Sequence, residues 1–525
     1  MLIPKVILSV IPLLNSNVMH LPSPMPAQCN EISSTTPKHY SLRFAEANNV
    51  QNLLCNRDGN TMTYISEGAL NMNALLRNVN ASLLDSLVCN NEFGDHYCYM
   101  PADVSDSGFL QTIPSAGGTL TLTYFGKQTD VVVETVNCGF LPLNNMLIRS
   151  ANKDVDPYKL FNKSQNCEVN VVCNVEADKI KRSVCRLVIN GNMLGTGSLI
   201  NTTEEDLTPY VITSAHTIEG SSETSKYNYV LKSCIAYFNY ETTDCISDTN
   251  PTNLEIINGG TLVAFAMYND AAIIKLSDTP SPNVNPYWTG WDASLQNPDD
   301  TDTYYCVHHP SGDAKKISIG QHIYVDDYNK CKAMTTTNER FKVDVHYHLD
   351  TWINGATEGG SSGAGLWNKD YKLVGCLTGG FSDCKKPNDD YFWTLFHAWD
   401  CVSHNDKEDI PNAYTSIGAI LDPSNSGITY MTGRNLNSKE SDIPKPSYSD
   451  ELRYVQSDAK IEILADNISQ VDIYSLAGQI VRSYSLPPDV NSFSIPTSTL
   501  PSSVYIISIK YATLSKNKKI KVWVP

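Results

Sequence analysis

Short runs in which apolar and polar residues alternate dominate the first 434 residues and predict β-strands. Residues 119–124 and 130–134 alternate in this way, and residues 184–189 return through 194–200 after the pair Asn190 and Gly191. Alternation with a period of two is typical of a strand with one buried face, and an Asn-Gly pair is a strong signal for a tight hairpin. Long helical periodicity is scarce, so we expect an all-β fold of barrels or sandwiches.

Changes in this pattern predict five segments along the chain. Residues 1–27 hold one lysine before an apolar run that is too short to span a bilayer as a helix, which is typical of a signal peptide. Residues 28–163 predict a β-rich N-terminal domain, and residues 164–434 predict a larger central β domain. Residues 435–455 are polar and carry prolines, as linkers do. Residues 456–525 alternate again and predict a small β-sandwich.

Composition narrows the classes of function. Of the 525 residues, 41% are hydrophobic and 18% charged, which is typical of folded domains. The formal net charge of -17 provides no basic face to neutralise phosphates, and therefore argues against a nucleic-acid partner. No phosphate-binding loop or dinucleotide fingerprint is convincing, so we expect no cofactor. Fifteen cysteines without close CxxC pairs argue against a zinc ribbon, and in an exported chain they favour disulfides.

Three segments carry residues suited to nucleophilic catalysis, and they follow one another in the order His, Asp, Ser. His216 ends an apolar strand, Asp270 directly precedes a buried strand, and Ser362 lies in the glycine-rich segment 357–365. A serine hydroxyl becomes a good nucleophile when an imidazole accepts its proton, and a carboxylate holds that imidazole in the right tautomer. Each segment alone is commonplace, but their combination predicts a catalytic triad.

The glycine-rich segment also predicts an oxyanion hole. Glycines at 360 and 363 allow a tight turn of the backbone around Ser362. The main-chain N–H groups of Gly360 and Ser362 would then both face the negative charge that develops on a substrate carbonyl.

Several segments of the central region resemble the lysyl endopeptidase branch of the chymotrypsin-like serine peptidases. The resemblance rests on GTGSLIN at 195–201, TSAH at 213–216, DAAIIKL at 270–276, HHPSGDAKKIS at 308–318 and TEGGSSG at 357–363. It implies a double six-stranded β-barrel with the active site between the barrels. It further implies a serine endopeptidase that hydrolyses protein or peptide substrates after lysine.

Some of the cysteines also match the family's pattern. It implies two disulfides, Cys167–Cys384 and Cys173–Cys245. The family has a further disulfide at two positions that are Gly195 and Thr217 in this chain. Both cysteines of this bridge are absent, which is expected if the whole disulfide was lost, because each cysteine needs the other to form it.

Specificity for lysine requires an acceptor for a buried ammonium group, because an unpaired charge in an apolar pocket is costly. By resemblance that acceptor is an aspartate two residues before a tyrosine, which is Asp389 before Tyr391. The adjacent Asp390 is the other candidate, and the alternative interpretation is that residues 388–390 form a solvated turn. Ala356, six residues before Ser362, leaves the trypsin-type pocket without its aspartate.

The residue before the nucleophile, Ser361, is not an aspartate, so activation of the trypsinogen type is not expected. We hypothesise instead that residues 28–163 form a propeptide, and that cleavage after Lys163 could be carried out by the enzyme itself.

The end of the chain resembles the sorting domain of proteins exported by the type IX secretion system. The resemblance rests on VDIYSLAGQIV at 471–481, LPSSVYIISI at 500–509 and KNKKIKVWV at 516–524. It implies recognition by the type IX machinery, passage through the periplasm of a bacterium with an outer membrane, and release or surface attachment. We expect no transmembrane segment and a monomeric protein.

Two alternatives remain open at this point. The chain could be a serine endopeptidase of another specificity, because Phe392 and Trp393 could reshape the pocket, or a non-catalytic surface binding protein on a protease scaffold. His346 and His348 share one face of a strand and could begin a metal site, but without a third ligand we expect exposed strand histidines and no metal.

Overall fold

The computed structural model contains two compact units, Met1–Leu436 and Asn437–Pro525. In the first unit it describes residues 17–24, 42–54, 60–105, 107–141, 164–174, 177–218, 231–243, 245, 254–295, 297–326, 346–401 and 414–436. In the second it describes residues 453–456, 460–464, 468–475, 479–486, 492–501, 503–511 and 518–524. Most of the expected signal peptide, Lys163 and most of the expected linker lie outside the described residues.

Two sheets form the N-terminal domain, as the alternating pattern predicted. One sheet has the order β1-β4-β10-β6-β7 and the other β3-β11-β5-β8, with β9 paired to β5. The strands are β1 (Asn17–Leu21), β3 (Ala45–Leu53), β4 (Thr61–Ser66), β5 (Asn71–Arg77), β6 (Leu84–Asn91), β7 (His96–Tyr99), β8 (Leu110–Gln111), β9 (Ser115–Ala116), β10 (Thr119–Gly126) and β11 (Val132–Gly139). Inward-facing apolar side chains of both sheets share one buried core.

The first barrel of the central domain is one antiparallel sheet with the order β17-β16-β13-β14-β15-β19-β18. Its strands are β13 (Val184–Ile189), β14 (Met193–Leu199), β15 (Tyr210–Ser214), β16 (Cys234–Phe238), β17 (Glu255–Asn258), β18 (Gly260–Ala266) and β19 (Ala271–Leu276). The predicted hairpin is confirmed, because β13 pairs with β14 around Asn190 and Gly191, which both have positive φ angles.

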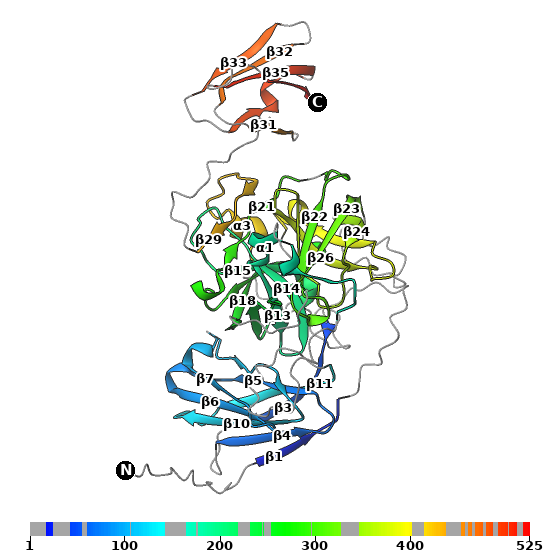
Figure 1. Cartoon of the computed structure of the whole chain (residues 1–525). Helices are drawn as coiled ribbons and strands as arrows, with labels where there is room; N and C mark the ends of the chain where they lie inside the picture. The colour runs from blue at the N-terminus through cyan, green and yellow to red at the C-terminus, as the bar shows by residue number, and fades with distance from the viewer. Residues whose placement is uncertain are drawn as a thin grey trace, which may run out of the picture. The chain divides into compact units, whose positions relative to one another are not determined.

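The second barrel is closed, in the order β25-β22-β23-β24-β27-β26, by pairing of β26 with β25. Figure 1 labels its strands β22, β23, β24 and β26. Its strands are β22 (Tyr304–His308), β23 (Lys316–Asp326), β24 (His346–Asn354), β25 (Gly365–Trp367), β26 (Leu373–Gly380) and β27 (Asp390–Thr394). Helices are short: α1 (Asp178–Lys181), α2 (Leu395–Ala398) and α3 (Ile417–Leu421). The expected all-β double-barrel fold is therefore confirmed.

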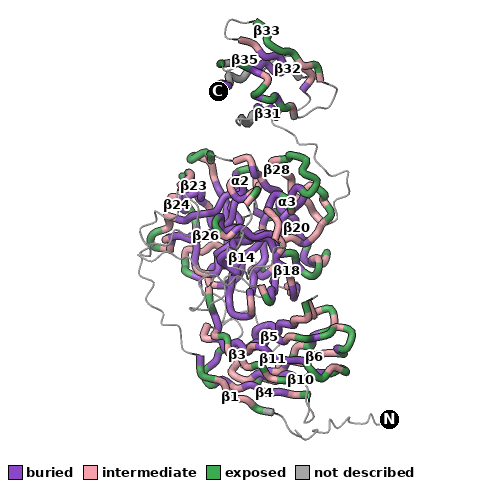
Figure 2. The backbone as a smooth tube through the Cα atoms, turned by 180° about the vertical axis from the view of Figure 1, so that it is seen from behind, coloured by how far each residue is buried: buried purple, intermediate pink, exposed green. Residues whose placement is uncertain are grey.

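A common core joins the two barrels. It contains Ile212 and Ile273 from the first barrel and Trp367 and Trp393 from the second, all fully buried. Figure 2 shows the corresponding concentration of buried backbone in this domain. The side chains between the barrels are thus as fully buried as those inside them, as in a close-packed protein interior.

The second unit is a small sandwich, as predicted. It has a three-stranded sheet in the order β30-β31-β34 and a four-stranded sheet in the order β33-β32-β35-β36. The strands are β30 (Arg453–Gln456), β31 (Lys460–Leu464), β32 (Ile468–Ser475), β33 (Ile480–Ser485), β34 (Ser492–Pro496), β35 (Ser503–Tyr511) and β36 (Lys518–Val524). Among the described residues, no helix is long and apolar enough to cross a membrane.

Candidate active site

Two adjacent strands of the first barrel bring His216 and Asp270 together. β15 leads directly into a 3-10 turn, Ala215–Ile218, that carries His216. Asp270 immediately precedes β19 and adopts a left-handed conformation with φ 58°. Because Ser214 on β15 pairs with Ala271 on β19, the two functional residues emerge at the same end of the sheet.

Their contact is short and buried. His216 Nδ1 lies 2.8 Å from Asp270 Oδ2 and 3.0 Å from Oδ1. The main-chain N–H of His216 also donates to Oδ1 at 2.9 Å. Both side chains are buried, with 1% and 0% of their surfaces exposed. The carboxylate therefore holds the proton on Nδ1, which leaves Nε2 as the basic nitrogen. Within the described part of the chain, Nε2 has no hydrogen-bond partner.

The Ser362 loop of the second barrel is fastened to the first barrel at its main chain. Thr196 on β14 donates its N–H to the carbonyl of Ser362 at 2.9 Å, and its hydroxyl to the carbonyl of Gly360 at 2.9 Å. Gly363 packs so closely on Thr213 and Ser214 that a Cβ would collide with them. Ser362 is thus held beside the end of β15, the strand that leads to His216.

The two glycines around Ser362 have the conformations that the sequence predicted. Their φ angles are +94° at Gly360 and +82° at Gly363, in the left-handed region that side-chain-bearing residues rarely adopt. A Cβ on Gly360 would approach the main chain of His309 and Gly312 to 2.9 Å. Only glycine therefore suits this turn, which carries the expected oxyanion donors.

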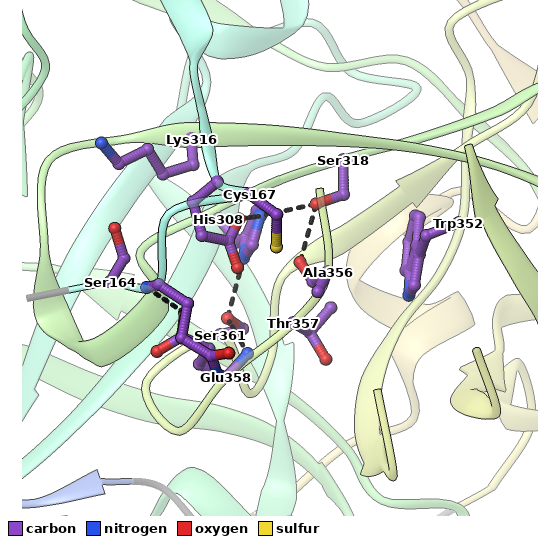
Figure 3. Close-up of polar contacts among 12 residues, drawn as sticks. Ser164, Cys167, His308, Lys316, Ser318, Trp352, Ala356, Thr357, Glu358 and Ser361 are labelled. Carbon is purple, nitrogen blue, oxygen red and sulfur yellow. Dashed lines mark hydrogen bonds and ion pairs between the residues drawn. The ribbon is translucent and has the colours of Figure 1, made fainter. Parts of the chain in front are cut away.

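A network of buried hydrogen bonds supports the loop (Figure 3). The hydroxyl of Ser361 lies 2.8 Å from His308 Nδ1 and accepts the main-chain N–H of Glu358 at 3.1 Å. His308 Nε2 contacts the hydroxyl of Ser318 at 3.1 Å, and this hydroxyl donates to the carbonyl of Ala356 at 2.7 Å. Burial lowers the pKa of His308 to about 3, so the imidazole is neutral. His308, from the HHPSG segment, therefore helps to position the loop of Ser362.

Asp389, the acceptor expected from the sequence, is only partly buried. Its carboxylate is 26% exposed, pairs with Lys386 Nζ at 3.0 Å and lies 3.2 Å from His348 Nε2. These partners already compensate its charge.

Asp390, by contrast, is fully buried at the start of β27. Its Oδ2 accepts hydrogen bonds from Trp352 Nε1 at 2.6 Å, from the hydroxyl of Thr357 at 2.8 Å and from the hydroxyl of Ser382 at 2.6 Å. Its Oδ1 lies against Gly380, where a Cβ would collide with it. Thr357 begins the segment that leads to Ser362, so this buried carboxylate is linked directly to the loop of Ser362. The sequence named Asp390 only as the second candidate, because it carried no signal of the strand's register.

The two strand histidines are not exposed, contrary to our expectation. His346 is fully buried and His348 is 6% exposed. Side chains of the neighbouring strands cover His348, whose ring stacks on that of Tyr391 and meets that of Tyr324 edge-on. Burial lowers the pKa of His346 to about 4. Ligand atoms of His348, Asp350 and Asp389 lie within 4.8 Å of one another and could hold a cation, although Lys386 already neutralises Asp389.

The structure forms both disulfides that the resemblance implied, Cys167–Cys384 and Cys173–Cys245. A Cβ on Gly195 would lie 3.2 Å from Thr217, so the two positions of the missing family disulfide are neighbours in space. Among the described residues, eight other cysteines are free thiols. The described part of the chain therefore has fewer disulfides than the number of its cysteines suggested.

Comparisons with known proteins relate two parts of the chain to described families. Residues 161–393 match the family "Lysyl endopeptidase, C-terminal domain", and residues 455–522 match the "Secretion system C-terminal sorting domain". The sorting domain indicates export to the cell surface or into the medium. A lysyl endopeptidase of Pseudomonas aeruginosa is 29% identical over 254 residues, which cover 44% of this chain and 50% of that protein. The chain thus spans about half the length of this curated relative.

Solved structures with similar folds include serine proteases. Mouse neuropsin, a serine protease expressed in the limbic system, is 15% identical; the match covers 41% of this chain and 91% of that one, with a TM-score of 0.29. A Glu endopeptidase is 17% identical; the match covers 41% and 87%, with a TM-score of 0.27. On the family matches, residues 161–393 are similar to the C-terminal domain of the lysyl endopeptidases, and residues 455–522 to the secretion system C-terminal sorting domain.

Proposed function

We propose that this protein is an exported serine endopeptidase that uses His216, Asp270 and Ser362 as its catalytic triad. The observation that carries the proposal is the buried contact of 2.8 Å between His216 Nδ1 and Asp270. A buried carboxylate that orients the histidine in this way leaves Nε2 free to act as a base. This arrangement activates a serine nucleophile.

In this mechanism the Ser362 hydroxyl attacks the carbonyl carbon of the scissile peptide bond while His216 Nε2 takes its proton. The N–H groups of Gly360 and Ser362 stabilise the resulting oxyanion, a contribution of roughly 2.7–4 kcal/mol for each donor. His216 then gives the proton to the leaving amine. Water, activated by the same imidazole, hydrolyses the acyl-enzyme and regenerates the serine.

We further propose that the enzyme prefers lysine at the residue whose carbonyl is attacked. A buried carboxylate next to the nucleophile loop favours a cationic side chain, because it can compensate an ammonium group that has left water. Asp389 was the acceptor chosen from the sequence. The burial of Asp390 and its link to Thr357 make Asp390 the stronger candidate, with Asp389 kept as the alternative.

Maturation would divide the chain as the sequence suggests. Residues 1–27 would serve as signal peptide, 28–163 as propeptide, 164–434 as protease domain, and 456–525 as the sorting domain read by the type IX machinery after the linker 435–455. β1 lies before residue 27 and pairs with β4, which favours an earlier end of the signal peptide. A new terminus at Ser164 would suit the fold, since its nitrogen lies 3.3 Å from the buried carboxylate of Asp313. Edman sequencing of the secreted protein tests this: a start far from residues 160–164 contradicts cleavage after Lys163.

Labelling with a fluorophosphonate tests the activity itself. The purified protein should react at Ser362, the Ser362→Ala variant should not, and Asp270→Asn should react far more slowly. Unlabelled wild-type protein would instead favour the non-catalytic binding protein on a protease scaffold. Cleavage of a peptide library then distinguishes lysine preference from another specificity.

A further inference from the structure

One edge of β14 runs past the nucleophile. β13 pairs with β14 along its length, from Met193 to Ser198, and so covers one edge of the strand. On the opposite edge β15 pairs only with Ser198 and Leu199. Between them, Thr196 bonds the main chain of Ser362. The edge at Met193 and Leu194 therefore continues outward from the nucleophile as a template for an extended peptide.

A short strand of the N-terminal domain occupies this template. β2 (Leu42–Arg43) pairs antiparallel with β14, Leu42 opposite Leu194 and Arg43 opposite Met193. Leu194 precedes Thr196 by two residues, which at about 3.3 Å a residue places β2 roughly 7 Å along the edge from the bond to Ser362.

The side chain of Leu42 also reaches the nucleophile loop. Its Cδ1 lies 3.5 Å from the point that a Cβ on Gly359 would occupy, an ordinary van der Waals contact. Gly359 directly precedes Gly360, a proposed oxyanion donor. β2 is thus packed on both walls of the proposed cleft at this point: the edge of β14 and the loop of Ser362.

Apolar packing behind β2 fixes it in this place. Phe44, the next residue, is fully buried in a cluster with Val188 and Leu194 of the first barrel and Ile113 of the N-terminal domain. Its N–H donates to the carbonyl of Asn192 at 3.0 Å. The strand is therefore anchored by its own chain and not only by two residues of pairing.

A second contact locks the hairpin that carries β14. The turn residue Gly191 inserts among the side-chain amides of Asn73, Gln111 and Asn137, so closely that a Cβ would collide with them. Asn73 Nδ2 donates to the Gly191 carbonyl at 2.8 Å, and Ser233 donates to Gln111 Oε1 at 3.1 Å. Asn137 Nδ2 and Gln111 Nε2 both donate to Asn73 Oδ1 at 2.8 Å, so a buried set of hydrogen bonds surrounds the turn and makes the contact specific.

We propose that β2 occupies the subsite that would bind the substrate main chain on the leaving-group side of the scissile bond, and so keeps the uncleaved chain inactive towards polypeptides. The inference rests on the proposed function. The acyl side of the substrate would lie towards Asp390 in the second barrel, so β14 of the first barrel is left for the residues after the bond. Blocking that side alone leaves the nucleophile and the lysine pocket accessible to small substrates.

The test compares two substrates in full-length protein carrying Lys163→Ala, with intact mass confirming that the chain stays uncut. One is an N-acyl-lysine p-nitroanilide, which has no residue after the scissile bond. The other is an internally quenched peptide with four residues after lysine. The variant Leu42→Asp puts a charge between Gly359 and Leu194 and should release β2. Leu53→Asp, at an exposed position of β3, is the matched control.

We expect Leu42→Asp to raise the ratio of kcat/KM for the peptide to that for the anilide at least 10-fold, and Leu53→Asp to leave this ratio unchanged. Equal rates of fluorophosphonate labelling in all three proteins would show that the site itself is intact. An unchanged or lower ratio in Leu42→Asp, with labelling intact, would overturn the inference alone. Absence of labelling at Ser362 in every protein would refute the proposed function and the inference with it.

Discussion

The proposed lysine pocket depends on one buried carboxylate, so Asp390→Asn is the most informative substitution. The replacement keeps the shape of the side chain. Its amide oxygen can still accept from Trp352, Thr357 and Ser382, which together donate to Oδ2. The amide nitrogen then takes the place of Oδ1 beside Gly380. The substitution thus removes the charge and presents a donor to an ammonium group.

The magnitude follows from the distance and the surroundings. Two unit charges about 4 Å apart interact with about 4 kcal/mol at an effective dielectric constant of about 20, which suits a group with no exposed surface. At about 1.4 kcal/mol for each factor of ten, this corresponds to about a 10³-fold loss in kcat/KM for lysine substrates. Asp389→Asn should cost less than 10-fold, because Asp389 is 26% exposed and already paired with Lys386.

The assay is kcat/KM for two peptides that differ only in lysine or methionine at the cleavage position. Asp390→Asn should lower the lysine-to-methionine ratio about 10³-fold while leaving cleavage after methionine near the wild-type value, which controls for misfolding. If Asp389→Asn produced the large loss and Asp390→Asn did not, Asp389, the residue chosen from the sequence, would be the acceptor. The choice of Asp390 on the basis of its burial would then be wrong. If neither changed the ratio, a charge-based lysine pocket at this position would be refuted.

Two further predictions concern the backbone and the buried histidines. Gly360→Ala should lower kcat roughly 10²–10³-fold, because a Cβ at φ +94° would lie 2.9 Å from the nitrogen of Gly312 and displace an oxyanion donor. Gly359→Ala, which meets no atom closer than 3.5 Å, should retain activity, and equal losses in the two variants would contradict this assignment. Burial lowers the pKa of His308 to about 3 and of His346 to about 4, from a usual 6.5. Below pH 6.5 the unfolded chain therefore binds protons on these histidines that the folded chain does not bind. Their contribution to the free energy of unfolding is complete above pH 6.5 and should fall by up to about 1.4 kcal/mol per pH unit for each histidine as the pH drops towards these values; a urea midpoint equal at pH 7 and pH 5 would contradict it.

Much of this protein could be predicted from local sequence. Alternating residues identified β10 and both strands of the β13–β14 hairpin, because the side-chain period of a strand is a property of the strand itself. His216 and Asp270 were recognised because each sits directly beside a strand whose pattern is visible. Gly360 was recognised because a tight turn requires a residue without a side chain.

Other features depend on contacts between distant segments, and these only the tertiary structure decided. Whether Asp389 or Asp390 enters the interior depends on the register of β27 against β24 and β26, and a shift of one residue exchanges the two faces. The burial of His346 and His348 depends on the strands that flank β24. The pairing of Leu42 with Leu194 joins two domains, and a strand of two residues carries too little pattern to reveal its partner. Side-chain periodicity is encoded locally, whereas register and strand neighbours are set by the packing of the whole fold.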